Sequence, residues 1–194
     1  MMATGRNPEH ARDAVQQIGA AAPVDPRNLA EAADVVVVAI TWAGLESALT
    51  LVGAPNGTLA GKTVIDCTNP VDYATGRILP ESGSAAEHEA HIATGAHVVK
   101  ALHLFAGATW PFTGEPATSP VVPICGDDAH ALSLAEALIA DLGARTARLG
   151  GLDAARQAEE AAGFVMRVVA AGANPRFAVP DVDPARLRAG AAGQ

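Results

Sequence analysis

The chain is poor in positive charge. Its 194 residues hold 13 Lys and Arg against 21 Asp and Glu, a formal net charge of -8, and its lysines are Lys62 and Lys100. A surface that binds a nucleic-acid backbone needs clustered positive charge. We therefore expect no nucleic-acid partner, although a single Arg side chain is still enough to bind one phosphorylated ligand.

Long apolar runs are also missing. No stretch approaches the roughly 20 consecutive apolar residues that cross a bilayer. Residues 1–6 are too short and too polar for a signal peptide. These absences predict a soluble, cytoplasmic protein without a membrane partner.

Cysteine is scarce. Cys67 and Cys125 each lie in an apolar run near the end of an expected strand, and neither has a second Cys or a His at the spacing of a metal site. The sequence therefore favours buried, reduced thiols over a disulfide. It predicts no metal site.

A glycine-rich phosphate-binding turn is absent as well. A nucleotide-binding sheet normally opens with a strand and a Gly-x-Gly-x-x-Gly turn, whose backbone N–H groups bind the pyrophosphate. Gly5 stands alone, and Gly53 and Gly57 lie between an expected helix and an expected strand, which is the wrong context.

The most informative segment that is present runs from Ala33 to Trp42. It contains four successive valines, and the run Val35–Ile40 has no polar face. This pattern predicts a strand buried on both sides, as in parallel sheets that helices cover on both faces. Ligands of open α/β sheets bind at the carboxyl ends of such strands, so Thr41 and Trp42 lie at the expected ligand edge.

Strands and helices alternate along the rest of the chain, which predicts an α/β fold with a doubly wound, mostly parallel sheet. Polar residues mark N-caps at the helix starts, namely Asn7 before Pro8, Asp25 before Pro26 and Ser84 before Glu87, and Asp128 is read in the same way. We expect one domain over residues 1–171 and a flexible tail over 172–194. The expected strands cover 1–4, 21–24, 35–40, 63–67, 97–100, 121–125 and 143–149, with an irregular piece at 71–83 and a long loop at 105–120.

Five segments together resemble one family. The chain is similar to the NADPH-dependent oxidoreductases that reduce the deazaflavin coenzyme F-420, and to relatives that share their NADP-binding domain. The resemblance covers most of residues 1–170 in the family's order. The segments that carry it are 1–9, 33–42, 64–70, 98–103 and 122–128.

The resemblance implies that a unit is missing before Met1. In that family the Met-Met strand is the second strand, preceded by a strand, the glycine-rich turn and a helix, about thirty residues in all. A start codon assigned too late, or a shortened version of the protein, would explain the difference. The missing strand is the central one of a Rossmann-like sheet. Residues 1–4 and 35–40 must then pair directly or leave their edges open.

The resemblance also assigns cofactor-binding residues at the adenosine end. Thr4 and Arg6 match the hydroxyl and the guanidinium that bind the 2′-phosphate, so NADP is expected rather than NAD. Ile40, Thr41 and Trp42 match positions along the adenine-ribose and nicotinamide path. For Arg6 the alternative is a solvated side chain in a turn, and for Trp42 it is packing on the sheet.

At the nicotinamide end the resemblance points to Asn69, Pro70, Ala101 and His103. The amide of Asn69 is expected to bond the nicotinamide carboxamide, and His103 matches a position near the nicotinamide and deazaflavin rings. The alternatives are an ordinary Asn-Pro turn and a structural histidine. No catalytic residue is assigned, because hydride transfer between planar cofactors depends on stacking and positioning.

We therefore expect an NADP(H)-dependent oxidoreductase that moves a hydride between the nicotinamide and a deazaflavin or flavin, and either activity or its loss is compatible with this shortened form. One alternative is a catalytically dead Rossmann-like module for interaction or dimerisation, which the missing turn favours. Another is a related NADPH reductase that acts on a different organic substrate. The family is often dimeric through its C-terminal helix, and an apolar face is expected on helix 153–171. This face is consistent with a homodimer, and a core helix would look the same; its residues are Ala155, Ala158, Ala162, Val165 and Val169.

Overall fold

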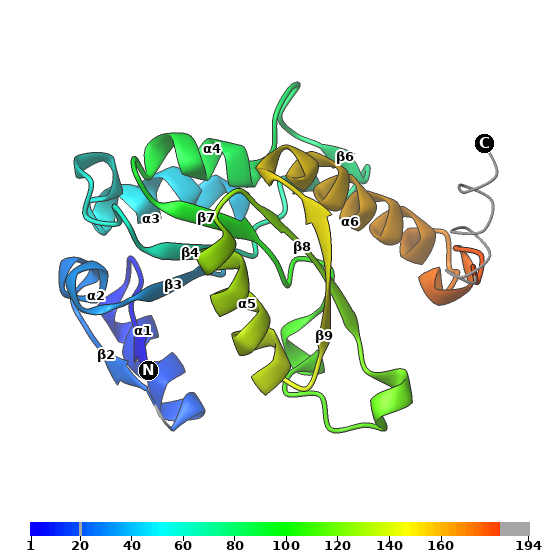
Figure 1. Ribbon diagram of the computed structural model, residues 1–194, viewed down its shortest axis with the longest axis horizontal. Coiled ribbons are helices and arrows are strands. Elements are labelled where there is room, and N and C mark those ends of the chain that lie inside the picture. The colour runs from blue at the N-terminus through cyan, green and yellow to red at the C-terminus, as the bar shows by residue number, and fades with distance from the viewer. Residues whose placement is uncertain (20, 183–194) are drawn as a thin grey trace.

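The protein is described here from a computed structural model, which covers residues 1–19 and 21–182 (Figure 1). The expected flexible tail therefore falls partly outside the described residues, since its last twelve positions, 183–194, are not covered. Within the described part of the tail, Pro175–Phe177 form a short 3-10 helix capped by Asn174.

A five-stranded sheet forms the centre of the molecule. Its order is β3-β4-β7-β8-β9, and every neighbouring pair is parallel except β7 with β8. This confirms the predicted α/β fold with a mostly parallel sheet. The strands are β3 (Val35–Val38), β4 (Thr63–Asp66), β7 (His97–Lys100), β8 (Val121–Gly126) and β9 (Arg145–Gly150).

Helices cover the two faces of this sheet. On one face, α3 (Leu45–Leu51), α4 (Ala85–Ile92) and the start of α6 (Ala155–Ala170) pack on Val64 and Val98. On the other, α5 (Ala129–Asp141) packs on Ile65 and Val99 (Figure 1). Because successive strand residues point to opposite faces, these two pairs of neighbours separate into two cores.

The expected helix starts are confirmed. The side chains of Asn7 and Asp25 cap α1 (Pro8–Ile18) and α2 (Pro26–Ala32), each with proline in the first helical position. Ser84 and Glu87 form the capping box of α4, and Asp128 caps α5 by accepting from the Ala131 N–H. No helix among the described residues is long and apolar enough to cross a membrane.

The first two strands form a separate small sheet. β1 (Met2–Ala3) pairs in parallel with β2 (Ala22–Pro23), and the described residues give neither strand a ladder bond to β3. Of the two arrangements expected without a central strand, the structure has the one in which the edges stay open. It does not pair β1 directly with β3.

One expectation about the valine strand is wrong. The strand ends at Val38 rather than Ile40, and it is not buried on both sides, because Val37 is 46% exposed while Val36 and Val38 are buried. The cause is its position at the edge of the five-stranded sheet. Helix α5 packs on β4 and the strands beyond it, and on the same face of β3 Val35 packs partly buried against that core while Val37 stays exposed.

The irregular segment after β4 contains a hairpin that the sequence did not predict. β5 (Val71–Asp72) pairs with β6 (Arg77–Ile78) in antiparallel fashion, and the hairpin packs against α6. Two-residue strands are too short to show a period in the sequence. Their close packing needs glycine, since a Cβ on Gly163 of α6 would lie 2.4 Å from the Gly76 carbonyl oxygen.

Candidate functional site

A cavity of about 600 Å³ separates β1 from β3. Its walls are mainly apolar and come from β1, from β3 and from helices α2 and α3. Exposed apolar side chains such as Met1, Val37 and Leu51 line it. The cavity is within the size range of small-molecule sites, which run from about 300 to 1,000 Å³.

Among the described residues, β1 and β3 each have unpaired backbone N–H and C=O groups on the side that faces away from the strand they pair with. The carbonyls of Asp34 and Val38 accept bonds from β4, so the alternate residues Val35 and Val37 direct their N–H and C=O groups to the other side. On β1 the Met1 and Ala3 carbonyls accept from the β2 side, which leaves the groups of Met2 directed away from β2. The cavity thus lies between two open parallel edges; we call it the strand slot.

Four of the predicted cofactor-binding residues meet at this slot. Thr4 and Arg6 follow β1, Ile40 and Thr41 follow β3, and all four line the cavity at the carboxyl ends of their strands. Arg6 is exposed, so its guanidinium is free of the cost of desolvation. A ligand phosphate placed there would meet one positive charge and the Thr4 hydroxyl.

Trp42 does not join them. It starts the short 3-10 helix Trp42–Gly44 and packs, partly buried, against the core beside α3 and α4. Its ring lies 5.3 Å from the His88 ring at a tilt of 58°. The structure therefore places Trp42 in the packing position that was the alternative at the sequence level.

A second group of predicted residues lies at the carboxyl ends of β4 and β7. The Asn69 side-chain N–H donates to the His103 carbonyl oxygen at 2.6 Å, which joins the two segments that follow these strands. The Asn69 Oδ1 atom is buried and has no partner among the described residues. Pro70 and Ala101 are buried beside them.

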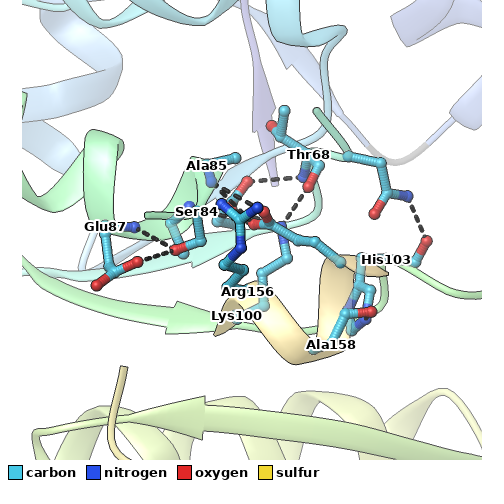
Figure 2. Close-up of polar contacts among 12 residues, drawn as sticks. Thr68, Ser84, Ala85, Glu87, Lys100, His103, Arg156 and Ala158 are labelled. Carbon is cyan, nitrogen blue, oxygen red and sulfur yellow. Dashed lines mark hydrogen bonds and ion pairs between the residues drawn. The ribbon is translucent and has the colours of Figure 1, made fainter. Parts of the chain in front are cut away.

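His103 points into the protein. Its ring is 6% exposed, and its Nε2 lies 3.1 Å from the Ala158 carbonyl oxygen of α6, as Figure 2 shows. Since a carbonyl only accepts, Nε2 carries the hydrogen, and Nδ1 is left as a buried acceptor without a partner in the described chain. Burial, with the nearby Lys100 charge, lowers the pKa of His103 to about 3, so the ring is neutral.

A fully buried lysine lies behind this site. The Lys100 Nζ atom is 2.8 Å from Asp66 Oδ2 and 2.8 Å from Glu159 Oε1, and it also donates to the Thr68 carbonyl (Figure 2). Burial acts to lower the pKa of Lys100, but the two carboxylates outweigh it and keep that pKa above its usual value. We call Asp66, Lys100 and Glu159 the ionic cluster.

Glu89 of α4 lies close to the ionic cluster and is fully buried. Neither of its carboxyl oxygens has a hydrogen-bond partner in the described residues. Burial, with the neighbouring Asp66 carboxylate, raises its pKa well above its usual value. Burial at this position therefore favours the neutral, protonated form of the Glu89 carboxyl group.

The two cysteines are free thiols, as expected. Cys125 is buried and Cys67 is half-buried. Burial raises the pKa of Cys67 to about 12 and that of Cys125 to about 11, so neither is a thiolate at neutral pH. Neither is activated as a nucleophile.

Comparison with known proteins confirms the resemblance seen in the sequence. A family model described as "NADP oxidoreductase coenzyme F420-dependent" matches residues 1–70. Those residues include the strands β1, β3 and β4. They also include seven of the predicted cofactor-binding residues, namely Thr4, Arg6, Ile40, Thr41, Trp42, Asn69 and Pro70. Among curated proteins, no match was found.

Solved structures have the same fold. A putative F420-dependent NADP reductase from Arthrobacter sp. FB24 is 25% identical with a TM-score of 0.73, over 89% of this chain and 84% of its own. A hypothetical protein from Sinorhizobium meliloti is 24% identical with a TM-score of 0.66, over 79% and 75%. An imine reductase from Myxococcus stipitatus, solved with NADP+, is 16% identical with a TM-score of 0.62, and this chain spans 54% of it.

The sequence analysis missed the ionic cluster and Glu89. A signal existed for part of it, since Asp66 follows Val64-Ile65 and Lys100 follows Val98-Val99, which puts a charge at the end of two buried strands. Buried charges are paired. Glu159 and Glu89 gave no such signal, because each lies on a helix with other polar residues around it.

The buried acid gives a prediction about pH. In the unfolded chain Glu89 ionises near pH 4.5, whereas the folded protein keeps it protonated to higher pH. The contribution of Glu89 to stability is therefore lost as the pH rises from the unfolded pKa through the raised pKa of the folded protein. Glu89→Gln keeps the shape and removes the titration. The stability of the variant relative to the original protein should increase between pH 5 and pH 8, measured by urea unfolding.

The matched control is Glu81→Gln, at an exposed position. Its stability difference from the original protein should stay the same at both pH values. A Glu89→Gln difference that is equally constant would contradict a protonated Glu89 in the folded protein.

Proposed function

We propose that the chain is part of an NADP(H)-dependent oxidoreductase that moves a hydride between the nicotinamide and a deazaflavin or flavin-like cofactor. The observation that carries the proposal is the meeting of Thr4, Arg6, Ile40 and Thr41 at one slot between strand ends. The match of residues 1–70 to a family of NADP oxidoreductases supports it. So does the shared fold with the putative reductase from Arthrobacter.

The residues present fit the adenosine end of NADP. Arg6 can give two parallel charge-assisted bonds to a 2′-phosphate, and Thr4 can add a hydroxyl bond. Both lie beside the apolar wall of Ile40 and Thr41, a suitable surface for an adenine ring. An Asp or Glu in place of Arg6 would instead favour NAD.

They also fit the nicotinamide end. The Asn69 amide donates to the His103 carbonyl, and its buried Oδ1 has no partner among the described residues, so Oδ1 is an acceptor available to a ligand. A carboxamide N–H₂ group is a donor of the right kind. The bound cofactor would supply the hydride chemistry, while the chain's own residues bind and orient it.

We further propose that a β-strand fills the strand slot and brings the pyrophosphate-binding turn. The slot has open parallel edges on both sides and apolar walls, so a parallel apolar strand would satisfy both edges at once. A glycine-rich turn after such a strand would lie at the same edge as Arg6 and Thr41.

This proposal predicts a difference in NADPH binding. The chain should bind NADPH weakly, and a version that carries an N-terminal strand, Gly-x-Gly-x-x-Gly turn and helix should bind at least about tenfold more tightly, because helix N-termini and backbone N–H groups hold pyrophosphate. Nicotinamide fluorescence would measure both affinities.

The control extension replaces the three glycines of the turn by valines and keeps the strand. It should restore the sheet without the pyrophosphate site, so NADPH binding should stay weak. If the extended version with glycines bound no better than the chain alone, the family interpretation would be wrong.

Arg6 gives a prediction about specificity. In the extended version, Arg6→Gln should weaken NADPH binding about tenfold or more and leave NADH binding nearly unchanged, since a charge-assisted bond contributes about 1.5–3 kcal/mol. Arg27→Gln is the matched control, an exposed arginine outside the slot lining. Equal losses for NADPH and NADH would show that Arg6 does not bind the 2′-phosphate.

We also propose that the protein is a homodimer through the C-terminal half of α6. This half extends away from the sheet (Figure 1), and it exposes apolar side chains, among them Phe164 at 49% and Val169 at 50%. Tyr73 and Leu79 of the adjacent hairpin segment are exposed too. Ala155, Ala158 and Ala162, on the apolar face expected from the sequence, are buried in the core, so the proposed interface uses these exposed side chains instead.

The dimer prediction concerns mass in solution. Light scattering should give the mass of two chains, and Phe164→Glu should give a single chain, because it would bury a charge in the interface. Leu149→Glu on β9 is the matched control, 47% exposed and away from α6, and it should stay dimeric. A monomeric original protein would overturn the proposal.

A second function has one observation in its favour. The open edges of β1 and β3 are suited to pairing with another polypeptide, which favours an interaction module without catalysis. A reductase that acts on another organic substrate is a further alternative, since an imine reductase has the same fold. The NADPH titration separates the module from both reductases, since only a reductase needs to bind the nucleotide.

A further inference from the structure

The Lys100 ammonium joins three segments that are distant in sequence. Its partners are Asp66 at the end of β4, the Thr68 carbonyl in the next turn, and Glu159 in α6, and Lys100 itself ends β7. An ammonium has three N–H donors, and here each one has an acceptor. The group is fully buried, so no solvent competes with these bonds.

Lys100 contacts the turn after β4 at two points, the Asp66 carboxylate and the Thr68 carbonyl. Asp66 Oδ1 accepts from the Thr68 N–H at 2.7 Å, while Lys100 binds the Thr68 carbonyl. The next residue is Asn69, whose amide donates to the His103 carbonyl. The position of Asn69 Oδ1 thus follows from how Lys100 fixes Thr68.

The segment after β7 is strained. Leu102, between Lys100 and His103, has a φ of 59°, in the left-handed region that side-chain-bearing residues rarely adopt. Such a conformation is unfavourable for a residue with a side chain and persists only where the surroundings enforce it. Here Lys100 holds one side of Leu102, and the contacts of His103 with Asn69 and Ala158 hold the other.

Helix α6 binds Lys100 through the Glu159 carboxylate. Glu159 accepts from the Ala85 N–H at 3.0 Å and from the Ala86 N–H at 3.4 Å, so its carboxylate lies between Lys100 and the N-terminus of α4. One residue earlier, the Ala158 carbonyl binds the His103 ring. Figure 2 shows Lys100, His103 and Ala158 together beside this turn of α6.

We propose that Lys100 and Glu159 are positioning residues, which hold the Thr68–Pro70 turn and the strained Ala101–His103 segment in the arrangement that a nicotinamide carboxamide meets. The identity of that ligand rests on the function proposed above. The positioning itself is a property of this chain, because the bonds that produce it are all within the described residues.

The test compares two neighbouring glutamates of α6. Glu159→Gln keeps the shape of the side chain but removes its charge from Lys100, whereas Glu160→Gln removes an exposed pair with Arg156. Hydrogen–deuterium exchange is measured on peptides covering residues 66–72 and 101–105, and on α5 as a reference across the sheet. Urea unfolding gives the global stability of each protein.

With Glu159→Gln, exchange at 66–72 and 101–105 should rise by about tenfold or more beyond any change in α5, because a buried charge has lost its partner and Leu102 can relax. Glu160→Gln should leave all three regions within about twofold. A rise that is equal in α5 and in both segments would mean that the cluster adds only global stability, and it would overturn the proposal. No rise in either segment would overturn it as well.

If Glu159→Gln does not fold, Glu159→Asp takes its place, since it withdraws the carboxylate by one methylene and keeps the charge. The same two regions and the same two outcomes then apply. Either variant is purified as the full chain and checked for cooperative unfolding before exchange is measured.

A ligand measurement separates this proposal from the proposed function. In the extended version, Glu159→Gln should weaken NADPH binding about tenfold and leave 2′-phospho-ADP-ribose, which lacks the nicotinamide, within about twofold. Equal weakening of both ligands would overturn the link to the nicotinamide end. If the unsubstituted protein binds neither ligand, the proposed function fails, and the exchange results still decide whether Lys100 and Glu159 position the two segments.

Discussion

The interaction on which the rest of the structure depends is the burial of the Lys100 ammonium. A charge without solvent requires anions and acceptors around it, so Asp66, Thr68 and Glu159 must converge on one point. Removing one partner of such a group costs on the order of 3–5 kcal/mol, against a total stability of about 5–15 kcal/mol for a typical protein. Helix α6 is therefore part of the folded unit rather than an appendage.

A second constraint acts at the β3 edge of the sheet. Strands with unpaired backbone groups are either covered or paired in stable proteins, yet β1 and β3 face one cavity with open edges on both sides. The apolar walls and the exposed Val37 show that this region is built like the interior of a sheet. The slot is also where Thr4, Arg6, Ile40 and Thr41 lie together, at the carboxyl ends of β1 and β3.

Much of the fold was predictable from local chemistry. Asn7-Pro8, Asp25-Pro26 and the Ser84–Glu87 pair specified helix starts because a side chain caps nearby N–H groups. The full burial of β3 was predicted wrongly, since a run of valines reads the same at a sheet edge and at its centre. Trp42 was ambiguous for a similar reason: an aromatic residue at a helix start suits both a ligand wall and a core.

By itself, the sequence determined the order of the longer strands and the helices, the mostly parallel sheet and the strand ends at which Thr4, Arg6 and Asn69 lie, because these follow from periodicity and capping over a few residues. The tertiary structure alone decided that Glu159 pairs with Lys100, that His103 turns inward to Ala158, and that β1 stays apart from β3. Such relations between segments far apart in the chain depend on how whole elements pack, and no local pattern encodes them.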